Sequence, residues 1–162
     1  MAWSLCAMRT GIEIREMIAD FKKSDLIRQG ILHAREASGN GYHLEAITTW
    51  ESLIWEGMAR YIASRTGKPV EVSTSLNALL QRLKKIEEDY ELNTDEKTLC
   101  GLRHQVDTWR KRREEAVHSL ALIEEGKHHT FKDKVSLQVQ YARNGEALFK
   151  EIKELLEALK IS

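Results

Sequence analysis

The sequence has few of the residues that interrupt regular structure. Pro69 is the only proline, and nine glycines are spread over 162 residues. A fold with many tight turns needs more of these residues than the chain contains. The scarcity disfavours a many-stranded β fold and predicts a few long helices.

Cysteines and long apolar runs are also scarce. Cys6 and Cys100 are far apart and have no metal-ligand spacing, so we expect neither a disulfide framework nor a cysteine metal site. No window approaches the ~18 apolar residues of a membrane span. The opening segment 1–8 is mildly apolar, but it is too short for a signal peptide and lacks a basic start. We therefore expect a cytoplasmic protein with no membrane partner and no cofactor.

The chain has no excess charge of either sign. Lys and Arg number 25, and Asp and Glu also number 25. This balance excludes a surface that is basic overall, although a local basic patch remains compatible with it. Hydrophobic residues make up 42%, which is enough to bury a core, so the chain is not of the disordered class.

Four short polar segments divide the sequence into five apolar-periodic stretches. These segments are residues 38–41, 66–69, 92–94 and 125–129. The stretch 42–65 is apolar on more than one side, which is typical of a helix in the middle of a bundle. Ser73 or Ser75 is the expected N-cap of the third helix, and Thr94 that of the fourth. The fifth places Leu137 and Tyr141 on its apolar face.

The predicted fold class is therefore all-α, an antiparallel bundle of four to five helices. Residues 1–38 form an N-terminal helical segment and residues 39–162 form the bundle, within what we expect to be one domain.

One position of the fourth stretch departs from its apolar pattern. Seven seam positions are apolar and the eighth is Arg113; the seam is Leu99, Leu102, Val106, Trp109, Arg113, Ala116, Leu120 and Ile123. Because burying an unpaired guanidinium is very costly, Arg113 must meet a partner charge, a phosphate or water. Either the helix end is solvated and Arg113 reaches water, or the seam faces a second protomer or a ligand there.

Basic residues cluster around this position. Between 103 and 113 there are five bases and one acid, Asp107; the bases are Arg103, Arg110, Lys111, Arg112 and Arg113. His118 follows five positions after Arg113. A cation beside an imidazole suits phosphodiester chemistry, because one stabilises charge and the other moves protons.

The segment Arg113-Glu114-Glu115-Ala116-Val117-His118 resembles the signature of the HEPN superfamily, an Arg, four to six residues and a His. The order of the stretches resembles the family too, with a central helix, a shorter helix, the motif helix and a long closing helix over about residues 35 to 160. Glu114 stands where the family usually has Asn, Asp or His. Arg112 also satisfies the spacing, so either arginine can be the motif residue.

The resemblance implies a metal-independent endoribonuclease of the toxin–antitoxin or phage-defence type. His118 and Arg113 would be catalytic, with Glu114 orienting them, while Arg110, Lys111 and Arg112 would bind substrate phosphate. On a regular helix Arg113 and His118 point about 140° apart. The resemblance resolves this with a homodimer whose two motif helices share one RNA-binding cleft; a helix distortion is the other solution.

Two other functions remain open. One is a non-catalytic module of the same fold that docks an antitoxin or a nucleotidyltransferase-type protein. The other is a helical adaptor unrelated to the family. For His128-His129 we expect no metal site, because they flank a turn and form no recognisable ligand pattern with acids or cysteines. Trp50, Trp55 and Trp109 have helical spacings, and we expect them in the core.

Overall fold

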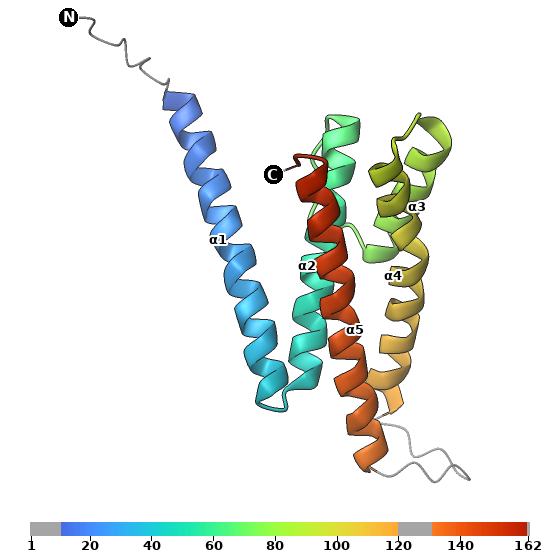
Figure 1. Ribbon diagram of the computed structural model, residues 1–162. Helices are drawn as coiled ribbons and strands as arrows, with labels where there is room; N and C mark the ends of the chain where they lie inside the picture. Colours follow the sequence, from blue (N-terminus) through green and yellow to red (C-terminus); the bar gives the residue numbers. More distant parts are fainter. Residues whose placement is uncertain (1–10, 120–130, 162) are drawn as a thin grey trace, which may run out of the picture.

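The structure is a computed structural model that describes residues 11–119 and 131–161, with side chains described for residues 23–114 and 132–161. Its described part is built of five helices and contains no strand, which confirms the predicted all-α bundle (Figure 1). The helices are α1 (Gly11–Gly39), α2 (His43–Thr66), α3 (Leu76–Asp89), α4 (Thr94–Ser119) and α5 (Phe131–Ala158). Over these residues, no helix combines the length and apolar character that a membrane span requires.

Helix α2 lies at the centre and contacts α1, α3 and α5, while α4 packs against α3 and α5. Helices that follow one another directly, such as α1–α2 and α4–α5, run antiparallel (Figure 1). Helices α2 and α5 run in the same direction, since Trp50 lies beside Gly145 and Gly57 lies beside Ile152. The most central pair of the bundle is therefore parallel.

The core explains why α2 is apolar around most of its circumference. Ten of its residues are buried: Ala46, Ile47, Trp50, Leu53, Ile54, Gly57, Met58, Ala59, Tyr61 and Ile62. Trp50 packs against Phe149 of α5 with ring centroids 5.8 Å apart. Trp109 of α4 is buried in the same core, as expected, and Trp55 is partly buried with its Nε1 donating to the carbonyl of Thr74.

Helix starts follow local hydrogen bonds. Ser75 caps α3, because its Oγ accepts the N–H of Ala78 at 3.2 Å. The expected cap of α4 is wrong by one residue: Asn93 accepts the N–H of Glu96 at 2.9 Å, and Glu96 accepts the N–H of Asn93 at 3.0 Å. This reciprocal pair is a capping box, which satisfies two helix-end donors at once.

Glu96 also joins helices. Its carboxylate is 7% exposed and lies 2.8 Å from Nε of Arg65 on α2. The carboxylate that caps α4 therefore also ties the start of this helix to the end of α2.

A glycine on α5 lets the helices approach closely next to the basic segment. A Cβ on Gly145 would lie 2.8 Å from the indole of Trp109 and 3.1 Å from Cβ of Trp50. Only hydrogen fits there, so α2, α4 and α5 meet at this level. The contact fixes α4 one turn before Arg113.

The buried face of α5 differs from the expected one near its start. Leu137 is 40% exposed and Tyr141 only partly buried, whereas Ala142, Leu148 and Phe149 are buried. Because α5 packs against both α2 and α4, its core face lies between these helices. Leu137 lies outside it.

The expected N-terminal segment 1–38 corresponds, over its described part, to α1, which ends at Gly39. Ala34 and Ala37 of α1 belong to the common core. Ion pairs of 2.6 Å join Lys23 to Glu56 of α2 and Arg35 to Glu146 of α5. This part of α1 therefore packs as a member of the same bundle.

Candidate functional site

The Arg-to-His motif, from Arg112 or Arg113 to His118, lies in the last three turns of α4. Residues 110–118 are all helical, and side chains are described as far as Glu114. The backbone of His118 belongs to α4, but its imidazole lies outside the described side chains. The expected catalytic role of His118 therefore stays a prediction.

Arg113 meets a partner charge within its own chain. Its guanidinium forms an ion pair with the carboxylate of Glu51 on α2, and the two side chains are 24% and 23% exposed. Nε of Arg113 is buried and has no hydrogen-bond partner among the described residues. Of the environments that the sequence left open, the described residues show a partner charge, and it comes from α2.

Arg110 and Lys111 are paired along α4 itself. Arg110 lies 3.0 Å from Asp107 and 3.1 Å from Glu114, and Lys111 lies 2.6 Å from Asp107. These are the three- and four-residue spacings at which helix side chains meet. The hydrogen bond from Lys111 lowers the pKa of Asp107, against a smaller effect of burial, and Arg110 adds to the lowering.

Glu114, expected to orient the catalytic pair, accepts a hydrogen bond from Arg110, and its orienting role stays a prediction. Among the described residues no contact joins it to Arg113. Arg103, the remaining base of the segment outside the motif, pairs with Glu87 of α3.

Arg112 differs from the other four bases of this segment. Within the described part of the chain it has neither an ion-pair nor a hydrogen-bond partner, and its side chain is exposed. It is therefore the one guanidinium of the segment that is free of an acid partner in this part of the molecule.

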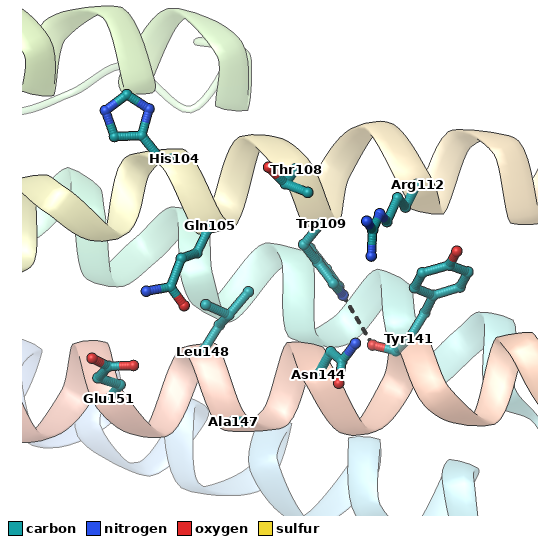
Figure 2. A pocket seen from close by; sticks show the side chains of 10 residues that line it. All are labelled: His104, Gln105, Thr108, Trp109, Arg112, Tyr141, Asn144, Ala147, Leu148 and Glu151. Atoms are coloured by element: carbon teal, nitrogen blue, oxygen red, sulfur yellow. Dashed lines mark hydrogen bonds between the residues drawn. The ribbon is translucent and has the colours of Figure 1, made fainter.

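Arg112 lines a groove between α4 and α5 with a volume of about 440 Å³, a size typical of ligand sites. Figure 2 shows its guanidinium pointing from α4 toward α5, near Trp109 and Tyr141. The two helices are joined there by the hydrogen bond from Nε1 of Trp109 to the carbonyl of Tyr141, 2.9 Å long. The lining residues are His104, Gln105, Thr108, Trp109, Arg112, Tyr141, Asn144, Ala147, Leu148 and Glu151.

The two ends of this groove differ in charge. Arg112 and Tyr141 stand at one end, and His104 and Glu151 at the other (Figure 2). The rise of α4 between His104 and Arg112 is about 12 Å. The side chains of Gln105 and Asn144 lie between, so the groove runs from a cation through amides to a carboxylate.

The other groups that could bind a metal ion or act as nucleophiles lie outside the motif. The part of the chain with described side chains holds no group of three or more His, Cys, Asp or Glu that could bind a metal ion. His128-His129 lie outside the described residues. Burial raises the pKa of Cys100 and that of Tyr61, whose hydroxyl donates to Glu96, so neither is ionised near neutral pH.

Sequence reasoning did not identify Glu51, Asn144 or Glu151 as neighbours of the motif. The signal for Glu51 is that it is one of few acids on a helix that is otherwise mostly apolar. Asn144 and Glu151 carry no such signal, because they lie on the solvent-exposed side of α5. Only the packing of α4 against α5 brings them into the groove that Arg112 lines.

Comparison of the chain with protein-family models, with curated proteins and with solved structures finds no match.

Proposed function

We propose that this chain is a HEPN-like domain that binds and cleaves RNA without a metal ion, in a site shared by two copies. One observation carries the proposal: the guanidinium of Arg112, which has no partner among the described residues, opens onto a groove, and Arg112-x5-His118 has the spacing of the family motif. The helix order supports it too, since the central α2, the short α3, the motif helix α4 and the long α5 follow the family's order.

In this proposal Arg112, rather than Arg113, holds the scissile phosphate. A guanidinium can bind two phosphate oxygens at once, and none of the N–H donors of the Arg112 side chain has a partner among the described residues. Arg113 is engaged by Glu51 and fixes α4 against α2. It therefore acts as a positioning residue that holds the motif helix in place.

His118 supplies the proton transfer. Its imidazole takes the proton of the ribose 2′-hydroxyl, and the 2′-oxygen attacks the phosphorus while the bond to the 5′-oxygen breaks. A second imidazole, His118 of the other copy, gives a proton to the leaving 5′-oxygen. Arg112 stabilises the negative charge that develops on the phosphate, and the product ends in a 2′,3′-cyclic phosphate.

The geometry of α4 is the reason for requiring two copies. His118 follows Arg112 by six positions, so on a straight helix the two side chains point about 120° apart. One helix cannot aim both at one phosphorus atom. Two helices across a two-fold axis can, which is why the proposal includes a homodimer. Such an enzyme would act in the cytoplasm, in toxin–antitoxin or phage defence, with an antitoxin as a further partner.

One observation favours a second function, a non-catalytic module of this fold that docks a nucleotidyltransferase-type or other protein. Glu51 occupies Arg113, and Glu114 adds a second carboxylate to the motif. Both carboxylates repel phosphate. If they prevent RNA from approaching His118, the fold still offers a surface for a protein partner.

The test is cleavage of single-stranded RNA in excess EDTA, with each variant at equal folded concentration. We expect His118→Ala and Arg112→Ala each to lower the rate by about 10²–10⁴-fold. Arg112→Lys should restore only part of the activity, because a point charge loses the two-point grip on phosphate. Arg143→Ala is the matched control, since Arg143 is an exposed arginine on α5 outside the groove. Activity that requires a metal, or that survives His118→Ala, contradicts the proposal; inactivity of every protein favours the docking module.

A further inference from the structure

Beyond Arg112, the groove between α4 and α5 is lined by polar side chains that lack partners. Gln105, Asn144 and Glu151 form no hydrogen bond or ion pair within the described part of the chain. We infer that this groove holds one nucleotide of single-stranded RNA, its phosphate on Arg112, and that it prefers a base with an exocyclic amine, cytosine or adenine, over uracil. The inference rests on the proposed function for the choice of RNA as ligand.

The phosphate belongs at the Arg112 end because that end carries the groove's only free cation among the described side chains. Glu151 at the opposite end repels a second phosphate (Figure 2). A nucleic-acid backbone therefore cannot follow the groove along its length. The arrangement instead accepts one phosphate with its nucleoside extending toward the carboxylate.

The middle of the groove suits the face of a base. Trp109 and Leu148 are buried and form an apolar floor, and Tyr141 adds a partly exposed ring near the phosphate end. Aromatic side chains bind single-stranded RNA by stacking on its bases. An unpaired strand is required, since only there are the faces and edges of the bases accessible.

The far end selects the edge of the base. Toward that end the amide of Gln105 can donate and accept a hydrogen bond, whereas the carboxylate of Glu151 can only accept. Cytosine and adenine present an amine there, and Asp and Glu accept from the cytosine amine while Asn and Gln pair with adenine. Uracil presents a carbonyl oxygen at the same position, which the carboxylate repels.

A binding experiment that does not depend on cleavage tests this. The affinities of a labelled cytidylate pentamer and a labelled uridylate pentamer are measured by fluorescence anisotropy with the His118→Ala protein. The two probes are matched in size and differ in the base, an amine in one replacing a carbonyl in the other. We expect the cytidylate to bind about 10-fold more tightly, the effect of one good contact to a base edge.

Three further substitutions in the His118→Ala background locate the effect. Glu151→Gln should abolish most of the cytosine preference, because an amide can pair with either base. Arg112→Ala should weaken both probes about 10-fold and lower the slope of log affinity against log salt by about 0.7. Arg143→Ala, outside the groove, should leave the base preference and the affinity nearly unchanged.

The outcomes separate this inference from the proposed function. If the wild-type protein cleaves RNA but binds both probes equally, or if Glu151→Gln keeps the preference, the groove assignment is wrong and the nuclease stands. If binding follows the groove variants but no RNA is cleaved, the groove assignment stands and the nuclease is wrong. If neither probe binds, the groove assignment is overturned.

Discussion

Breaking the ion pair between Glu51 and Arg113 should cost more stability than breaking an ordinary surface pair. Exposed pairs contribute about 0.2–1 kcal/mol, whereas removing one partner of a fully buried pair costs about 3–5 kcal/mol. With 24% and 23% exposure, this pair lies between these limits. We expect Glu51→Ala to lower the free energy of unfolding by about 1–3 kcal/mol. With a urea m-value of about 2 kcal/mol per molar, the midpoint would fall by about 1 M.

A double-mutant cycle separates the pair from the loss of each side chain. The cycle of Glu51→Ala and Arg113→Ala should give a coupling energy of about 1–2 kcal/mol in equilibrium urea unfolding. Lys150 and Glu154 provide the matched control, a four-residue pair on α5 with side chains 73% and 63% exposed. Its coupling should be about 0.3–0.5 kcal/mol. If the two coupling energies are equal, the ion pair of Arg113 with Glu51 is no stronger than an exposed pair. It then does not fix α4 against α2.

Three other properties can be measured by simple methods. Gly145→Ala should destabilise the protein by about 1–3 kcal/mol in urea unfolding, since a Cβ there would lie 2.8 Å from an indole carbon, whereas Gly101→Ala meets nothing within 4 Å and should stabilise by about 0.5–1 kcal/mol. Burial raises the pKa of Glu56, but hydrogen bonds from Lys23 and Arg60 outweigh it and lower the pKa below the unfolded value of 4.5. The ionised Glu56 carboxylate therefore stabilises the fold above pH 4.5, and this stabilisation is lost as the pH falls through the folded pKa. Urea midpoints measured against pH should therefore fall less steeply below pH 4.5 in Glu56→Gln than in the wild type. In a Cys6→Ser variant, the buried Cys100 should react with a thiol reagent only as fast as the bundle opens, because a buried thiol is not accessible to the reagent and burial also raises its pKa. Reaction at the rate of a free thiol would contradict that burial.

The helices could be predicted from the sequence because their signals are local. Turn residues and apolar periodicity define α2 and α3, and the buried tryptophans follow from the same periodicity. The cap of α4 was misplaced because Asn93 and Thr94 are adjacent residues of similar capping ability.

The site could be predicted only in part, for a physical reason. The pairing of Arg110 with Asp107 and Glu114 follows from spacings within one helix. The pairing of Arg113 with Glu51 joins two helices, and it depends on how α4 packs within the bundle. The arginine at an apolar seam position indicates that its charge needs a partner, but the sequence does not identify Glu51 as that partner. That Arg112 has no partner among the described side chains likewise depends on the packing, because two of its four basic neighbours, Arg103 and Arg113, pair with acids on other helices.

The chemical nature of the RNA ends produced in excess EDTA shows whether the protein cleaves RNA through the ribose 2′-oxygen. Attack by the ribose 2′-oxygen leaves a 2′,3′-cyclic phosphate on one product and a free 5′-hydroxyl on the other, and it needs only imidazole and guanidinium groups. Mass spectrometry of the cleaved oligonucleotide distinguishes these ends from a 3′-hydroxyl and a 5′-phosphate, which attack by water produces. We expect the wild-type protein to form the cyclic phosphate and the His118→Ala protein not to form it. Products with a 3′-hydroxyl and a 5′-phosphate would contradict it.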